Sequence, residues 1–467
     1  MLLLRSPSPP DLDTAARSAG YDTARVAVVA ALITGIVGVF VTIGADARWL
    51  AALGRIIAHR GAIPAGVPFA TADTSRWANP LVLAELAFHG LESAFGDRGL
   101  IVANLVAIAA ALALLAADAR RDGARPLGIP GALALVAVGS LASLAVARVQ
   151  MFSLVLFPAM LLLLRSETRR PSARIWLALP LLALWSNLHG AALAGLALLY
   201  AYLALERFRG ERLVAVLVAL AAPLAMCLTP AGIRTVDYYR GLVTNVAAER
   251  GAGQWAPFGH SPFDWVLLVA VAALLALALR PPRRRLPWWE VLALAGFAAL
   301  TVKAGRDGVW LMFLLVAPAA KGSRAARGWN GLLPVGAAAA VALLAFAVAR
   351  QPTGAGVSRA VLAEALARAH GTPVLADGIA AEQVALAGGR IWAGNPLDAF
   401  SRSVQGEYLD WLDGDRSGAR AFAIAGVRVV LVANGDGAAR LTRSDPAYRY
   451  VAGDGSSSLY ERRSAGG

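Results

Sequence analysis

The sequence predicts a mainly α-helical, polytopic membrane bundle of about eleven spans, followed by a small extracytoplasmic α/β domain. Of the 467 residues, 58% are hydrophobic and only 16% are charged, and the mean hydropathy is +0.59. Apolar runs recur as far as residue 350, and ordinary polarity follows. Soluble globular proteins do not have this composition, so we expect a transmembrane domain over residues 1–350 and a soluble domain over residues 351–467.

The apolar runs and the basic residues between them predict the topology. The runs cover residues 25–45, 99–117, 128–147, 150–164, 175–188, 190–205, 213–230, 263–279, 288–303, 308–320 and 331–349. Basic residues cluster in alternate turns, at Arg120, Arg121, Arg125, Arg165, Arg169, Arg170, Arg174, Arg207, Arg209, Arg212, Arg280, Arg283, Arg284, Arg285, Lys321, Arg324 and Arg327. Short loops rich in positive charge stay in the cytoplasm. With the chain broken at His189–Gly190, this rule places the N-terminus inside and the C-terminal domain outside the plasma membrane.

The same distribution of charge excludes other classes of protein. The formal net charge is +14, but it is explained by topology, so we expect no nucleic-acid partner. The single cysteine, Cys227, lies in an apolar run, so no internal disulfide is possible.

Three long polar segments face the predicted outer side: residues 46–98, residues 232–262 and the C-terminal domain. The first is too long for a connector, since most connections span only a few residues. It begins at Asp46, directly at a membrane exit. An acid there is a candidate catalytic residue by default, and a carboxylate solvated by headgroup water is the alternative. The stretch after Asp46 has helical spacing, which predicts an interfacial helix with Trp49 as its membrane anchor.

Glu85 is the second candidate catalytic acid. It shares a predicted helix face with His89 and Glu92, so Glu85 and His89 are candidates for a base or a metal site, and a solvated face is the alternative. No HExxH pattern is present, so no metal-ligand set is assigned.

Further outer residues are candidates for substrate binding. Arginine suits phosphate, tryptophan suits a sugar ring, and amide and imidazole groups suit hydroxyls. Snorkelling of the arginines and capping of helix ends are the alternatives. The candidates are Arg55, Trp77, His89, Arg148, Gln150, Asn187, His189, Arg240, Glu249, Trp255, Lys303 and Arg306.

In the C-terminal domain, β-rich runs alternate with helical stretches, which predicts a partly parallel sheet. The expected strands are residues 372–377, 390–394 and 427–434, with a closing hairpin around Gly453–Ser457. The expected helices are residues 357–370, 380–388, 403–413 and 436–443. No glycine-rich phosphate loop opens a helix here.

Several short motifs, in order, resemble bacterial polytopic membrane proteins of the GT-C glycosyltransferase superfamily, which includes protein mannosyltransferases and lipid A aminoarabinose transferases. The motifs are D-x-x-W-x-x-x-x-G from Asp46, IP-x-x-x-PF from Ile63, W-x-N from Trp77 with AEL at 84–86, R-x-Q-x-FS from Arg148, W-x-N-x-HG from Trp185, P-x-G from Pro230, QWAP from Gln254, the late Arg306, WAGNPLDAF at 392–400 and VVLVANGDG at 429–437.

The resemblance implies transfer of a sugar from a polyprenyl-phosphate donor to an envelope glycan, lipid or protein on the outer membrane face. It assigns Asp46 as general base on an acceptor hydroxyl, and arginines to the leaving phosphate, often with a divalent metal such as Mg²⁺ or Mn²⁺. A base and leaving-group cations are what glycosyl transfer to an alcohol needs.

Four outer-loop residues, at three places in the chain, depart from the family pattern. Leu50, Val67 and Pro80–Leu81 stand where the family often has polar residues. This keeps open a non-catalytic protein that binds or flips a lipid-linked glycan or scaffolds envelope assembly. A secondary transporter would show two similar hydropathic halves, and the sequence has no such repeat.

Overall fold

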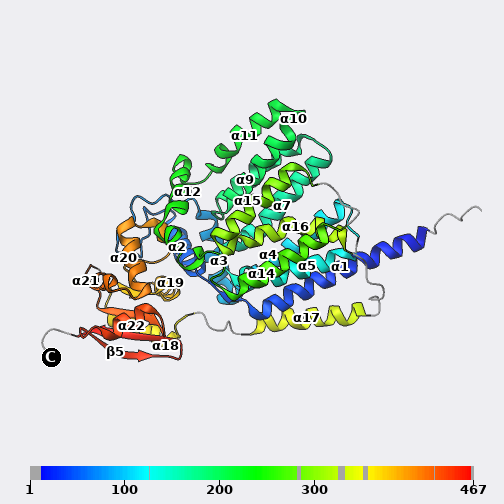
Figure 1. Ribbon diagram of the computed structural model, residues 1–467. Helices are drawn as coiled ribbons and strands as arrows, with labels where there is room; N and C mark the ends of the chain where they lie inside the picture. Colours follow the sequence, from blue (N-terminus) through cyan, green and yellow to red (C-terminus); the bar gives the residue numbers. More distant parts are fainter. Residues whose placement is uncertain are drawn as a thin grey trace, which may run out of the picture.

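The computed structural model describes residues 12–125, 127–280, 286–323, 332–350, 356–424 and 426–463. Five of the arginines that we assigned to cytoplasmic turns lie outside these ranges: Arg283, Arg284, Arg285, Arg324 and Arg327. The described part of the chain forms a helical bundle with a small α/β domain packed against one end (Figure 1). We call this end of the bundle the domain end.

Helices occupy each of the predicted apolar runs. They are α1 (Leu12–Phe40), α4 (Asp97–Arg121), α5 (Gly128–Gly139) with α6 (Leu141–Leu144), α7 (Gln150–Arg169), η1 (Ala173–Leu177) with α8 (Ala178–Ser186), α9 (Ala192–Tyr202) continued by η2 (Leu203–Arg207) and α10 (Phe208–Gly210), α11 (Arg212–Met226), α14 (Pro262–Ala278), α15 (Trp288–Lys303), α16 (Gly308–Gly322) and α17 (Leu333–Ala349). Figure 1 shows α17 lying along α1.

Three described helices are long and apolar enough to cross a membrane: residues Asp22–Phe40 of α1, α4 and α7. Other runs form shorter apolar helices, among them α5, α11, α14 and α17. The helical character of the runs is therefore confirmed, and the number of eleven spans stays a prediction.

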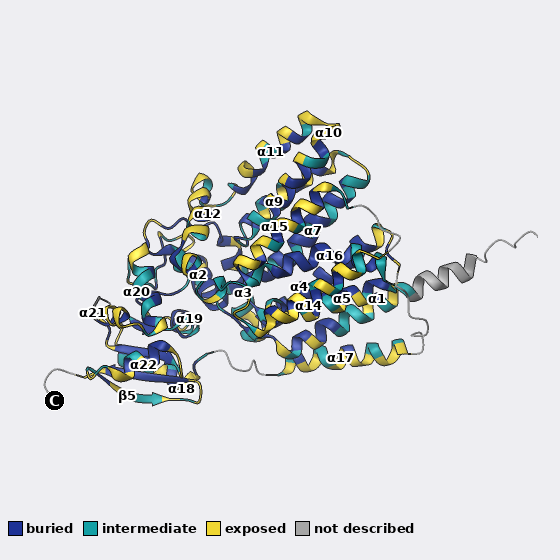
Figure 2. Ribbon diagram, in the orientation of Figure 1, coloured by how far each residue is buried: buried dark blue, intermediate teal, exposed yellow. Residues whose placement is uncertain are grey.

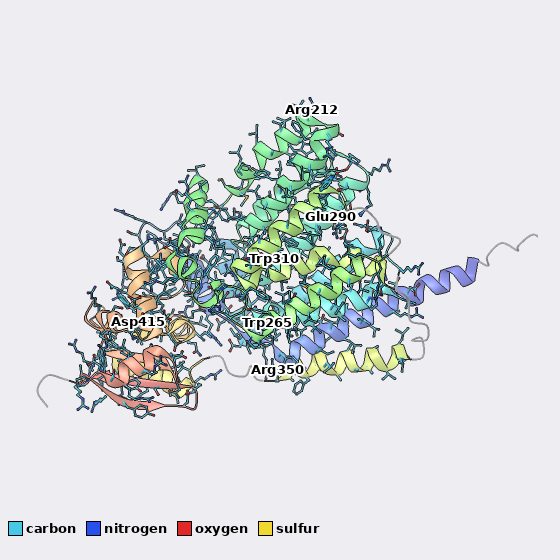
Figure 3. The ribbon with its side chains drawn as sticks, viewed as in Figure 1. Arg212, Trp265, Glu290, Trp310, Arg350 and Asp415 are labelled. Atoms are coloured by element: carbon cyan, nitrogen blue, oxygen red, sulfur yellow. The ribbon has the colours of Figure 1, made fainter. Side chains whose placement is uncertain are left out.

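Some arginines that we read as topology signals form buried ion pairs. Arg165 is bound by Asp118 and by Glu290, with 2.7 Å to the Glu290 carboxylate, and Figure 3 shows Glu290 inside the bundle. Arg207 pairs with Glu167 at 3.2 Å. Buried charges need partners, so these arginines hold neighbouring helices together.

The segment 46–98 contains the two predicted helices, α2 (Ala47–Arg60) and α3 (Val82–Phe95). The interfacial placement of α2 is wrong, because α2 packs between α3 and α19 (Gly378–Leu386) of the C-terminal domain. Trp49 is only 3% exposed, so it does not anchor a membrane surface. At Gly54, a Cβ would lie 2.0 Å from the Glu85 carbonyl oxygen. Glycine is therefore required for this close approach of α2 and α3.

The C-terminal domain has the partly parallel sheet that we predicted. Its strands are β3 (Val374–Ala376), β4 (Val429–Ala433), β5 (Tyr448–Gly453) and β6 (Ser457–Arg462), in the order β3-β4-β6-β5. β3 and β4 are parallel, and β5 and β6 form the predicted antiparallel hairpin. The helices are α18 (Arg359–Ala369), α19, α20 (Arg402–Asp413), α21 (Arg420–Ile424) and α22 (Gly437–Ser444).

Our prediction of a strand at residues 390–394 is wrong. Ile391 makes isolated bridges to Val374 and to Ala70 of segment 46–98. The Ile391 amide donates to the Phe69 carbonyl, and the Thr71 amide donates to the Ile391 carbonyl, both at 2.9 Å. Arg390 and Trp392 also bond to Val374 of β3, so the segment divides its backbone hydrogen bonds between the domain sheet and segment 46–98.

Candidate active site

A short parallel ladder brings two helix ends together at the domain end. β1 (Thr42–Ile43) follows α1, and β2 (Val146–Ala147) precedes α7. The two strands pair in parallel, Thr42 with Val146 and Ile43 with Ala147. Because parallel strands end at the same edge, Asp46 and Arg148, which follow them, lie at the same end of the ladder.

Asp46 has a left-handed backbone, with φ 80°. Such a conformation is costly for a residue other than glycine and needs support from its surroundings. The Asp46 amide donates to Glu382 Oε1 at 2.8 Å, and Trp49 Nε1 donates to Asp46 Oδ1 at 3.0 Å. Asp46 itself is half-buried. The Asp46 carboxylate is therefore held in one orientation, and the residue is still partly exposed to solvent.

Glu382 provides this support from α19 of the C-terminal domain. It also accepts hydrogen bonds from the Arg48 amide at 3.2 Å and from Asn395 Nδ2 at 2.8 Å. Burial, aided by the charge of Asp46, raises the pKa of Glu382 to about 7, although its three donors act in the opposite direction. The C-terminal domain thus contributes directly to the geometry at Asp46.

Two arginines supply positive charge next to Asp46. Arg148 is buried and donates to Gln150 and Gln254. Arg306, in η5 (Gly305–Asp307), lies over the Trp255 ring at 3.8 Å from its centroid. Burial lowers the pKa of Arg148 to about 10, Arg306 acts in the same direction, and Asp46 and Asp307 oppose it. Asp46 therefore lies within electrostatic range of both arginines.

A cavity of about 300 Å³ opens between these arginines and α14. Arg148, Gln254, His260, Asp264 and Arg306 are its charged and larger polar lining residues. Asp46 does not line this cavity. Two arginines and one acid, Asp264, therefore line a cavity that does not include Asp46.

A second acid faces Asp46 from the C-terminal domain. Asp398 accepts a hydrogen bond from Trp77 Nε1 at 3.0 Å. Burial raises the pKa of Asp398 to about 6, the Trp77 hydrogen bond opposes this rise, and the charge of Asp46 adds to it. Tyr238 is also buried in this group, and burial, together with the charge of Asp398, raises its pKa well above the usual value.

Glu85 is fully buried and does not pair with His89. Asn79 Nδ2 donates to Glu85 Oε2 at 3.0 Å, and the His89 ring instead lies 6.4 Å from the His59 ring. Burial raises the pKa of Glu85 to about 8, and the Asn79 hydrogen bond opposes this only in part. Glu85 is therefore mostly neutral at pH 7, which does not suit a carboxylate base.

We predict that Glu85 makes stability depend on pH. The folded chain keeps this proton up to about pH 8, whereas the unfolded chain releases it near pH 4.5. The folded state thus binds more protons inside this window, and stability falls as the pH rises through it, by at most about 1.4 kcal/mol per pH unit. Glu85→Gln, which keeps an acceptor for Asn79, should flatten the dependence of melting temperature on pH in detergent. The control is Glu92→Gln on the same helix, and an unchanged slope in Glu85→Gln would contradict the assignment.

The turn between α8 and α9 places its two candidates differently. Asn187 Nδ2 donates to the carbonyls of Ala183 and Leu228, both at 2.8 Å. This is the helix-capping role that we had left open. His189 Nδ1 contacts Ser153 Oγ at 2.6 Å. Burial lowers the pKa of His189 to about 3, and the charges of Arg148 and Arg306 act in the same direction. His189 therefore belongs to the cluster around the arginines.

Two predicted binding residues are exposed on the surface. Arg240 has a 75% exposed side chain and is 3.7 Å from Asp237. Lys303 ends α15 and is exposed.

Two other candidates join the bundle to the C-terminal domain. Glu249 pairs with Arg402 at 2.5 Å, and Arg55 donates to the Ala385 carbonyl at 3.4 Å. These contacts give both residues a structural role.

Sequence reasoning missed Glu382 and Tyr238 as site residues, and it included Asp398 and Gln254 only inside motifs. WAGNPLDAF and QWAP carry the last two, so the motifs were a signal for them. No local pattern distinguishes Glu382 or Tyr238 from a helix-surface residue.

The arrangement of acids does not fit a divalent metal. The described ranges contain no group of three or more His, Cys, Asp or Glu side chains that could hold one. Both Glu382 oxygens accept N–H donors, and one oxygen each of Asp46 and Asp398 accepts a tryptophan N–H. The arginines take the cationic position next to Asp46.

The apolar helices and the polar cluster at one end place the chain in the class of helical membrane proteins. No protein-family model matches the chain, and no curated protein matches it. Among solved structures, the chain is similar to a cryo-EM structure of the arabinofuranosyltransferase AftD from mycobacteria, with 15% identity and a TM-score of 0.48. The match covers 94% of this chain and 41% of that one, so the chain spans less than half of its length.

Proposed function

We propose that the protein is a membrane glycosyltransferase that moves a sugar from a polyprenyl-phosphate donor to an envelope acceptor at the outer face. The observation that carries this proposal is Asp46, oriented by Trp49 and by the Glu382 carboxylate, within electrostatic range of Arg148 and Arg306. An acid facing two cations suits a reaction that removes a proton at one atom and releases an anion at another.

The proposed reaction uses the acid and the two arginines in different roles. The Asp46 carboxylate accepts the proton of an acceptor hydroxyl, whose oxygen attacks the anomeric carbon of the donor. The bond between that carbon and the phosphate oxygen breaks, and the polyprenyl phosphate leaves with its electron pair. Arg306 and Arg148 stabilise the negative charge, and the cavity that they line holds the phosphate. Glu85, being neutral, supports α3 and takes no proton.

A second candidate is lipid-linked glycan binding without transfer. It is favoured by the lining of the cavity, which includes both arginines but not Asp46. The same cations would hold a lipid phosphate in either case, so the two functions differ in whether a new glycosidic bond appears.

The test is mass spectrometry of envelope lipids and glycans from cells that lack the gene and from cells complemented with variants. We expect a glycan or lipid to lose one sugar in the deletion, and Arg306→Gln to reduce the product on the order of 10²-fold. The matched control is Lys303→Gln, which removes a nearby but exposed cation and should behave as wild type. If the deletion leaves every mass unchanged, sugar transfer is excluded and the binding function replaces it.

A further inference from the structure

Helix α12 (Thr235–Thr244) has a buried face and an exposed face. Its inner face is buried: Tyr238 is 7% exposed, and a Cβ at Gly190 would meet the Tyr238 hydroxyl at 2.9 Å. Tyr239 lies beside it, with its hydroxyl 3.0 Å from Ser186 Oγ. α12 is therefore firmly packed on the turn that carries His189.

The outward face of α12 is divided into an apolar and a polar flank. Ile233, in the preceding turn η3 (Gly232–Arg234), is 72% exposed, and Val243 is 51% exposed. At 100° per residue along α12, Val236 and Val243 fall on one flank, whereas Asp237 and Thr244 fall on the other. Ile233 precedes the helix in η3. Arg240 lies between the flanks.

A stripe of exposed leucines on α11 precedes α12 in the chain. Exposed leucines recur along α11 at helical spacing and lead through Leu228 into η3. They are Leu213, Leu217, Leu220 and Leu224. Figure 2 shows the exposed positions along α11 and again on α12. Bare leucines on a helix of this apolar composition are the surface that a bilayer covers.

We infer that α12 is an interfacial helix docked on the outer leaflet, with Val236 and Val243 among the acyl chains. Arg240 lies at the headgroup level, where a guanidinium meets lipid phosphates, and Asp237 and Thr244 face water. Because the opposite face carries Tyr238, this helix separates the bilayer from the cluster around Asp46. The inference rests on the membrane location of α11 and does not depend on sugar transfer.

The test uses the full-length protein with Cys227→Ser as background, reconstituted in phosphatidylcholine–phosphatidylglycerol nanodiscs. Single cysteines at Val236→Cys and Val243→Cys report on the apolar flank, and Asp237→Cys and Thr244→Cys are the matched controls on the polar flank. All four positions are exposed, so an environment-sensitive dye attached there does not displace the core.

We expect dyes at 236 and 243 to emit at shorter wavelength and to be quenched by lipids with nitroxide-labelled acyl chains. Dyes at 237 and 244 should instead be quenched by iodide in solution. Iodide quenching of all four, with none by labelled lipid, would overturn the inference. Lipid quenching of all four would also overturn it, because the helix would then be immersed and not interfacial. The readout needs no activity, so it is independent of the outcome of the transfer assay.

Discussion

Asp46→Asn should abolish sugar transfer and leave the fold intact. Asparagine tolerates the left-handed backbone at this position, and its side-chain oxygen still accepts the Trp49 hydrogen bond. Only the ability to take a proton is lost. Loss of a general base costs about 10²–10⁴-fold in rate, so cells that carry the variant should resemble the deletion in the mass spectrometry of envelope lipids and glycans.

The control for this variant is its melting temperature and its amount in the membrane, both of which should match the wild type. Product at the wild-type level in cells carrying Asp46→Asn would remove Asp46 from the mechanism. A normal product with Asp46→Asn but a lost product with Arg306→Gln would favour a role in binding the lipid phosphate.

Glu382→Ala should have the second largest effect, through the position of Asp46. It removes the acceptor for the Asp46 and Arg48 amides and for Asn395. Buried donors left without a partner cost about 1–3 kcal/mol each, so the melting temperature should fall. The Asp46 turn loses the contact that supports its left-handed backbone. A small displacement of a reacting group costs on the order of 10²-fold in rate.

Two further variants distinguish positioning from loss of stability. Glu382→Gln keeps one acceptor oxygen and should restore part of the activity, mainly in kcat, because donor binding at the arginines is unaffected. Glu364→Ala removes an acid of the same domain that pairs with Arg368 on the surface, and it should leave activity and melting unchanged. Equal activity of Glu382→Ala and wild type would show that the C-terminal domain does not position Asp46.

Local sequence patterns predicted most secondary structure well, for identifiable reasons. In the C-terminal domain, β3, β4 and the hairpin of β5 and β6 are β-rich runs bounded by turn residues, and they appear where expected. The segment at residues 390–394 has the same β-rich composition but fails as a strand. Arg390 and Trp392 bond to Val374 of β3, but Ile391 bonds to Phe69 and Thr71, far away in the chain. Composition contains no information about those distant partners.

The candidate site was predicted unevenly. Asp46, Arg148, Trp255, His189 and Arg306 do gather at the domain end. Arg240 and Lys303 do not, because a polar residue in the same loop can as easily face solvent. Glu85 was recognised as an unusual acid, but its complete burial, and so its neutral state, follows from packing between α2 and α3.

The amino-acid sequence specifies that the chain before residue 350 is a bundle of apolar helices and that an α/β domain follows. Hydrophobic runs and turn residues act locally, so each helix or strand can be predicted from its own segment of the sequence. The sequence does not specify which polar groups come into contact. Asp46 and Arg148 come together through the pairing of β1 with β2, and Glu382 reaches Asp46 because the domain docks on α2. These contacts join segments distant in the chain, and only the packed structure sets them.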